Sequence, residues 1–140
     1  MKLLIILLCS LIWTAQGYAT IGAVILHEGN GEIERTTGDT EITVKDLDVF
    51  SYDVVKTGNG KTGIEFVDET RVDVTQHSKL IIDEFVYDPN TQTGALSLKA
   101  SLGTVRYASG QIAKNSKQNV KISTPTATIA VRGTDFAMTI

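Results

Sequence analysis

The sequence has few of the residues that support disulfide, thiolate or nucleic-acid chemistry. Its 140 residues include one cysteine, Cys9, and one tryptophan, Trp13, both near the N-terminus. Beyond them the chain has no thiol, which excludes a disulfide, a zinc–thiolate site and a cysteine nucleophile. Thirteen Lys and Arg residues stand against 16 Asp and Glu, a net charge of −3. This mild acidity argues against a sequence-independent nucleic-acid binder, which needs a basic face.

Residues 1–19 have the pattern of a secretory signal peptide. One basic residue, Lys2, precedes an apolar run that is too short to be preferred as a membrane span, and small residues follow. We predict cleavage before Thr20 and export to the periplasm or the extracellular space. Cleavage after Gly17 and retention as an uncleaved anchor are the alternatives. A lipoprotein is not predicted, because Leu8 stands before Cys9 where lipid attachment needs a small residue.

The composition of residues 20–140 predicts an all-β domain. Thr, Val and Ile contribute 40 of these 121 residues, Leu only six, and the whole chain has two prolines. β-branched side chains pack well on a pleated sheet and lose freedom in helices. Apolar and polar residues also alternate with period two, which is typical of half-buried strands. The alternating segments are 63–67, 71–75, 96–102, 120–123 and 136–140.

About ten short strands are expected, in two stacked sheets or a short β-roll, as one domain over residues 20–140. Residues 109–116 are the best place for one short helical turn. Glu28–Gly31 is interpreted as a hairpin turn between Val24–His27 and residues 32–36. The last strand runs to Ile140 without a stop signal, which predicts a truncated reading frame or a domain that continues.

No constellation predicts an enzyme. The only histidines are His27 and His77, and Ser78 next to His77 would face the opposite side of a strand. Two acidic groups could serve a glycosidase: Asp68-Glu69 with Asp73, and Asp83-Glu84 with Asp88. We interpret these groups instead as solvated strand ends and turns.

Two binding sites were weighed against simpler structural interpretations. Asp88, Asn90, Gln92 and Gly94 could hold calcium, but Gly94 is out of step with the EF-hand pattern, and loop chemistry explains the segment. Exposed aromatic rings could bind sugars by stacking. Phe66 and Phe136 fit the core register. The candidates for exposure are Tyr52, Tyr87 and Tyr107.

Arg132-Gly133-Thr134-Asp135 is the most individual segment of the chain. Arg132 follows residues 128–131, which are expected to form a buried strand, so its guanidinium would need carboxylate or carbonyl partners. We favour an internal arginine clamp that fixes strand register over ligand binding. Gly133 would mark a bulge or a close backbone approach.

The motifs together resemble the FecR protein domain from about Leu47 to Ile140. The most specific part is the final segment, Thr-Pro-x-Ala followed by Val-Arg-Gly-Thr-x-Phe. The positions that carry the resemblance, expected to be structural, are Thr57, Gly58, Phe66, Asp68, Thr70, Gly103, Thr124, Pro125, Arg132, Gly133, Thr134 and Phe136.

The resemblance implies a β-rich sensing or interaction domain outside the cytoplasm, with no catalytic, cofactor or metal residues. Glu69 departs from the family, which usually has Gly in this turn; Glu disfavours a positive φ, so the turn is expected to differ. Members that regulate sigma factors carry a cytoplasmic segment and a membrane span before this domain. Here a signal peptide stands in their place, so the anti-sigma role is not carried over and iron–siderophore signalling is only a minor variant.

Three functions follow in order of preference. The first is a non-enzymatic, exported interaction domain that binds a protein or cell-envelope partner. The second is a carbohydrate-binding or adhesive module, or a surface or virion structural component. The third is a hydrolase that uses the carboxylates of Asp68, Asp73 or Asp83.

Overall fold

The structure is a computed structural model that describes residues 19–132 and 135–140; the predicted signal peptide, apart from Ala19, and the Gly133-Thr134 pair lie outside the described residues. Among the described residues no helix is long and apolar enough to cross a membrane. The strands are β1 (Gly22–Glu34), β2 (Thr40–Ile42), β3 (Asp48–Val49), β4 (Val54–Phe66), β5 (Arg71–Val74), β6 (Lys79–Asp88), β7 (Thr93–Leu102), β8 (Thr104–Ala108), β9 (Val120–Ser123), β10 (Thr128–Ala130) and β11 (Phe136–Thr139). One helix, α1 (Gln111–Asn115), falls where a short helical turn was predicted.

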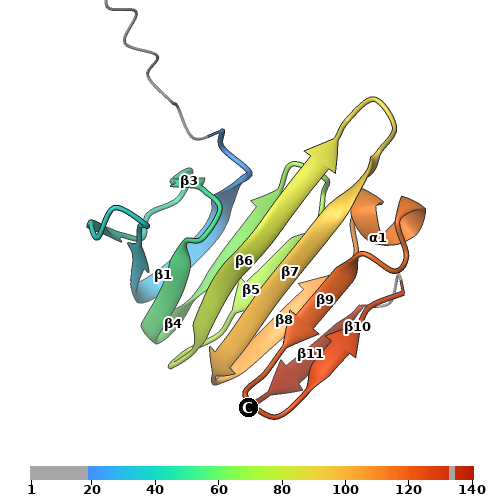
Figure 1. The fold of residues 1–140 in the computed structure, drawn as a ribbon. Helices are drawn as coiled ribbons and strands as arrows, with labels where there is room; N and C mark the ends of the chain where they lie inside the picture. The colour runs from blue at the N-terminus through green and yellow to red at the C-terminus, as the bar shows by residue number, and fades with distance from the viewer. Residues whose placement is uncertain (1–18, 133–134) are drawn as a thin grey trace, which may run out of the picture.

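These eleven strands form a single curled sheet, which confirms the all-β prediction. The order along the sheet is β10-β9-β7-β6-β4-β5-β8-β11, and β1 pairs with β4 and carries β2 and β3 on its other side. All pairs are antiparallel except β7 with β9. Figure 1 shows β6, β7, β9 and β10 in front of β5, β8 and β11, so the curl brings two parts of one sheet face to face.

The long strand β4 belongs to both parts of the curl. Its first residues, Val54–Lys56, pair with β6, whereas Thr62–Glu65 pair with β5. The strand therefore changes neighbours across the segment Thr57–Lys61, which contains Gly58-Asn59-Gly60. Strand glycines mark a bend or a close approach of another backbone, and both apply here.

The hairpin predicted at Glu28–Gly31 is wrong. β1 continues through this segment, with a register shift between Gly29 and Gly31 instead of a reversal. Gly29 lies opposite Gly60, so the two Gly-Asn-Gly motifs face each other across β1 and β4. A Gly-Asn-Gly segment suits a hairpin turn and a strand bulge equally well, and the long-range pairing selects the bulge.

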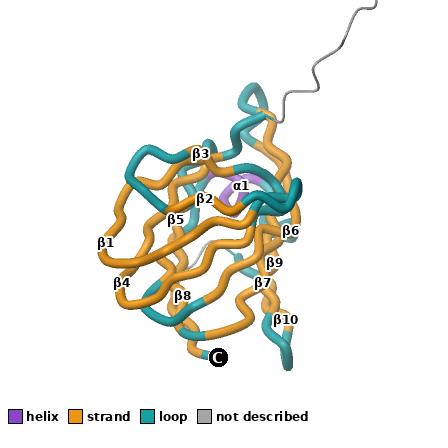
Figure 2. The backbone as a smooth tube through the Cα atoms, turned by 90° about the vertical axis from the view of Figure 1, so that its left-hand side faces the viewer, coloured by secondary structure: helices purple, strands orange, loops and turns teal. Residues whose placement is uncertain are grey.

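The curl encloses one apolar core. Its inward side chains come from the alternating positions of the strands, for example Ile64, Val72 and Leu98, which are fully buried. Phe66 and Phe85 stack inside it, with ring centroids 5.2 Å apart. At one end of the curl α1 adds Ile112 and Ala113 (Figure 2), so a five-residue helix caps an otherwise β-only core.

The turn between β4 and β5 keeps a left-handed residue although it carries Glu where the family usually has Gly. Glu69 has φ +70°, so the turn keeps a left-handed residue at this position, contrary to the expectation that it would differ. A side chain at positive φ costs about 1 kcal/mol relative to glycine.

We therefore expect Glu69→Gly to raise the free energy of unfolding by about 1 kcal/mol in urea denaturation, because it relieves this backbone cost. Glu69→Ala is the matched control, since it removes the carboxylate but keeps Cβ. Equal effects of both substitutions would contradict the backbone explanation.

Candidate functional site

Asp68 organises the end of the molecule that α1 covers. Its carboxylate is fully buried and accepts hydrogen bonds from Thr70 N (3.1 Å), Thr70 Oγ1 (2.7 Å) and Ile112 N (3.1 Å). The Asp68 carbonyl accepts a further bond from Gln111 N. Asp68 thus joins the β4–β5 turn to the start of α1. The expectation that this carboxylate is solvated is wrong, because backbone donors replace water around it.

A group of hydroxyl side chains, separate from the Asp68 site, joins three parts of the sheet. Thr57 Oγ1 on β4 donates to the Thr75 carbonyl and accepts from Ser78 N. Ser78 Oγ in turn accepts from Thr104 N at the start of β8. Gly103, with φ +80°, packs against Ser78 too closely to leave room for a Cβ. Thr57 and Gly103, two of the motif positions, thus connect through Ser78 the strand β4, the β5–β6 turn and the start of β8.

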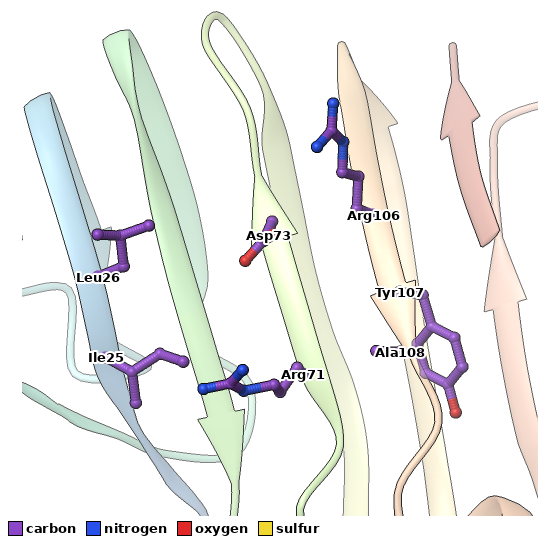
Figure 3. Close-up of a pocket in the computed structure, with 7 residues that line it drawn as sticks. All are labelled: Ile25, Leu26, Arg71, Asp73, Arg106, Tyr107 and Ala108. Atoms are coloured by element: carbon purple, nitrogen blue, oxygen red, sulfur yellow. The ribbon is translucent and has the colours of Figure 1, made fainter. Parts of the chain in front are cut away.

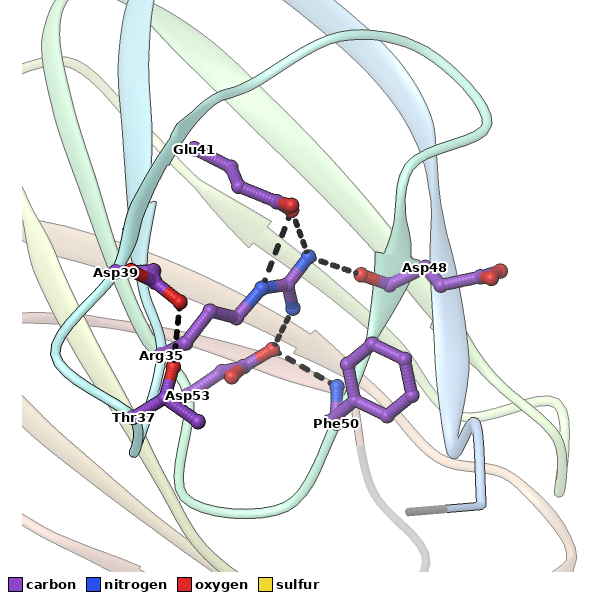
Figure 4. A network of polar contacts seen from close by, with 7 residues as sticks. All are labelled: Arg35, Thr37, Asp39, Glu41, Asp48, Phe50 and Asp53. Atoms are coloured by element: carbon purple, nitrogen blue, oxygen red, sulfur yellow. Dashed lines mark hydrogen bonds and ion pairs between the residues drawn. The ribbon is translucent and has the colours of Figure 1, made fainter. Parts of the chain in front are cut away.

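The main buried ion pair was not recognised in the sequence. Arg35 donates to the carboxylates of Asp53 and Glu41 and to the Asp48 carbonyl, and its guanidinium lies 5.0 Å from the centre of the Phe50 ring (Figure 4). Burial raises the pKa of Asp53, opposed by the Phe50 N–H and by Arg35. These contacts hold in place the segment between β1 and β4, which contains β2 and β3. Nothing near Asp53 in the sequence indicates Arg35 as its partner.

The predicted catalytic groups are not brought together. His77 is exposed, whereas Ser78 is 2 % exposed and its hydroxyl donates to the carbonyls of Gln76 and Thr104. His27 binds Thr62 and the Gly29 carbonyl on β1. Asp83 on β6 accepts a hydrogen bond from Ser97 and lies 3.5 Å from Lys99, both on the neighbouring strand β7. These contacts use the side chains structurally.

The loop weighed as a calcium site forms an ordinary turn, and of the three tyrosines Tyr52 is exposed, Tyr87 is half-buried and Tyr107 is buried. Asp88 Oδ1 accepts from Asn90 N at 2.9 Å, the hydrogen bond of an Asx turn. Within the described residues no three acidic, His or Cys side chains group as metal ligands. Tyr107 is 3 % exposed and packs on Phe136, so the expectation that it could be exposed is wrong. Its alternating position on β8 points into the core.

The expected internal arginine clamp at Arg132 is also wrong. Arg132 is exposed, as are all three residues of β10, and no salt bridge among the described residues involves it. The reason is that β10 is an edge strand, paired only with β9, so only Val131 reaches the core. The preceding Thr124 forms the β9–β10 turn, with its hydroxyl accepting from Ala127 N at 3.1 Å.

The outer face of β1, β4, β5 and β8 carries a hollow with both apolar and charged side chains in its walls. One cross-strand row runs Leu26–Gly63–Asp73–Arg106. Gly63 has no side chain, so Leu26 and Asp73 stand as walls on either side of bare backbone. The hollow measures about 430 Å³, and Figure 3 shows its lining side chains on neighbouring strands. We call it the outer trough; its lining residues are Ile25, Leu26, Arg71, Asp73, Arg106, Tyr107 and Ala108.

The trough combines apolar walls with unpaired charges of both signs. Arg71 is held by Glu65 at 3.0 Å. Arg106 and Asp73 take part in no salt bridge within the described part of the chain, although they are cross-strand neighbours. Arg106 also lines an adjoining hollow of about 640 Å³ that includes Lys61 and His77. Such a surface can bind a partner that presents side chains of both charges around an aliphatic side chain.

Among the comparisons with known proteins, the family profile agrees with the motifs. A solved structure titled "Cell surface anchoring domain" is 26% identical, with a TM-score of 0.42, and the match covers 44% of this chain and 82% of that one. No curated protein matches the chain significantly. The profile of the FecR protein family matches residues 53–140, which is more than half of the sequence and includes the whole segment from β4 to β11. The chain therefore belongs to the FecR family.

Proposed function

We propose that this protein is an exported, non-enzymatic interaction domain that binds a protein partner outside the cytoplasm through the outer trough. The observation that carries the proposal is the trough itself, in which Leu26 is 38% exposed beside Arg106 and Asp73, neither of which forms a salt bridge within the described residues. Arginine and exposed aliphatic side chains on a hollowed surface are common in protein interfaces. The signal-peptide pattern of residues 1–19 and FecR membership support an extracytoplasmic location.

The chemistry of the polar groups also favours binding over catalysis. Ser78, Thr57 and Asp68 are engaged with backbone groups, so the hydroxyls and the buried carboxylate serve the fold. The carbohydrate alternative loses Tyr107, one of its three proposed stacking side chains, to the core. A protein partner is therefore the better match to the exposed surface.

Site-specific photo-crosslinking in the producing cell tests this proposal. A photoreactive side chain at Arg106 should give a discrete adduct, whereas one at Lys121, on the outer face of the opposite part of the curl, should not. Leu26→Asp should weaken the adduct about tenfold, the effect of losing one well-packed apolar contact. Lys121→Glu is the matched surface control. Equal labelling from both faces, or an adduct that Leu26→Asp leaves unchanged, would contradict the proposal.

A further inference from the structure

A second hollow adjoins the outer trough and carries three basic side chains. It measures about 640 Å³ and lies where β4, the β5–β6 turn and the start of β8 meet. Lys61 comes from β4, His77 from the turn and Arg106 from β8, and all three side chains are exposed. Arg106 lines the trough as well, so the two hollows share one cation. We call this second hollow the basic hollow.

Small residues line much of the basic hollow and leave it open; they are Gly60, Thr75, Gly103 and Thr104. Their hydroxyls are engaged within the protein. Thr75 Oγ1 donates to the Thr104 carbonyl at 2.7 Å, and Thr104 Oγ1 lies 2.9 Å from Thr139 Oγ1. The long basic side chains are therefore the polar groups that remain to contact a ligand.

The turn that carries His77 is fixed to the strands on either side of it. His77 has φ +52°, and its backbone N–H donates to the Gly58 carbonyl at 2.9 Å. The next residue, Ser78, accepts from Thr104 N through its hydroxyl, and its own N–H donates to Thr57 Oγ1. A site whose backbone is already ordered pays less conformational entropy on binding.

The charge of the basic hollow is opposite to that of the whole chain. Its two permanent cations, Lys61 and Arg106, stand against the single carboxylate of Glu28, whereas the chain has a net charge of −3. No salt bridge within the described residues involves Lys61, His77 or Arg106. Glu28 lies opposite Lys61 across the strands, but an exposed pair of this kind is worth less than about 1 kcal/mol. The hollow therefore favours an anion.

The distance to the trough indicates what kind of anion fits. Leu26 precedes Glu28 by two residues on β1, and Glu28 is paired with Lys61. Side chains two residues apart on one face of a strand are separated by about 7 Å. An extended peptide repeats this spacing, so it can place one side chain on Leu26 and the next alternate one in the basic hollow. A free phosphate or a sulfated sugar would leave the exposed Leu26 uncovered.

We propose that the basic hollow binds an acidic side chain of the protein partner, two residues along an extended segment from an aliphatic side chain that packs on Leu26. The carboxylate lies between Lys61 and Arg106, whose planar guanidinium can bind both carboxylate oxygens. This inference rests on the proposed function, since it assigns charge and spacing to the segment that the trough binds.

The probe is a labelled synthetic peptide, Glu-Thr-Leu-Thr-Glu, in which an acidic residue lies two positions from leucine in either chain direction. We expect it to bind the protein in fluorescence anisotropy, less tightly as the salt concentration rises. Its binding should shift the amide resonances of Lys61, His77 and Arg106. Matched peptides with Gln or Lys in place of both Glu residues should not bind.

Charge reversal gives a readout that a merely structural role would not change. Arg106→Gln should weaken binding of the acidic peptide about tenfold, the loss expected for hydrogen bonds to a charged group. Lys61→Glu combined with Arg106→Glu should abolish binding of the acidic peptide and create binding of the Lys peptide. Lys121→Gln, on the opposite part of the curl, should bind like the parent.

Two results in this assay would overturn the inference. One is binding of the acidic peptide that survives the charge-reversed pair. The other is binding of inorganic phosphate or heparin by the parent without binding of the peptide, which would assign the cations to a free anion or a polysaccharide.

A photoreactive side chain at Ala108, in the trough, separates this inference from the proposed function. An adduct in the producing cell that Leu26→Asp removes and Lys61→Glu with Arg106→Glu leaves unchanged would overturn only the acidic recognition. The absence of any adduct from the parent would contradict the proposed function itself. Loss of the adduct in both variants, together with peptide binding, supports both.

Discussion

Gly60→Ala is expected to lower the free energy of unfolding by roughly 3 kcal/mol, one of the two largest effects of a single substitution that we predict. A Cβ at Gly60 would stand 1.8 Å from the Glu28 carbonyl oxygen. The obstacle is backbone of the paired strand, which cannot rotate away like a side chain. β1 and β4 would have to separate where both strands bulge, and their pairing is the most extensive in the sheet.

Gly58→Ala in the same Gly-Asn-Gly motif is the control. A Cβ at Gly58 meets nothing closer than 3.5 Å, so we expect a change within about 0.5 kcal/mol. Urea denaturation of both variants measures the contrast. Similar losses at the two positions would mean that the motif acts through flexibility instead of close approach.

Asp68→Ala is expected to lower the free energy of unfolding by about 3 kcal/mol. The substitution removes the acceptor of three hydrogen bonds and leaves the buried N–H groups of Thr70 and Ile112 without it. Leaving a buried donor unsatisfied costs about 1–3 kcal/mol. Asp68→Asn keeps one side-chain oxygen and should lose about half as much.

The position of the effect separates a local role from a general loss of charge. The rate of amide hydrogen exchange should increase at Ile112 and Ala113 of α1 before it increases in the sheet, because Asp68 joins α1 to the β4–β5 turn. Asp73→Ala removes a carboxylate that lies on the outer face, and it should change stability by less than about 0.5 kcal/mol. A loss at Asp73 as large as that at Asp68 would refute the buried-acceptor explanation.

Elements set by local pattern could be predicted from the sequence. Period-two alternation located β5, β7, β9 and β11, since one buried face imposes it residue by residue. The turn at Asp68–Thr70 and the short helix after Ser109 also follow from nearby residues. The ordered motifs of residues 53–140 were enough to indicate the FecR family. Mild acidity and the lack of cysteine after Cys9 narrowed the functional classes in the same way.

Long-range pairing determined the features that the local pattern left ambiguous or misled about. Gly29 and Gly60 oppose each other across two strands, so a segment that suits a turn became a bulge. Arg35 meets Asp53 because β1 and β4 are neighbours, and no spacing rule connects them.

The exposure of Arg132 and the burial of Tyr107 likewise depend on position within the sheet, at an edge or in the middle. The outer trough has the same origin, since Leu26, Asp73 and Arg106 become one surface only when three separate strands align. Sequence alone therefore determined the strand pattern and the family of this protein. The tertiary structure decided which backbones and charges meet, because hydrogen-bonded pairing joins residues that the chain keeps far apart.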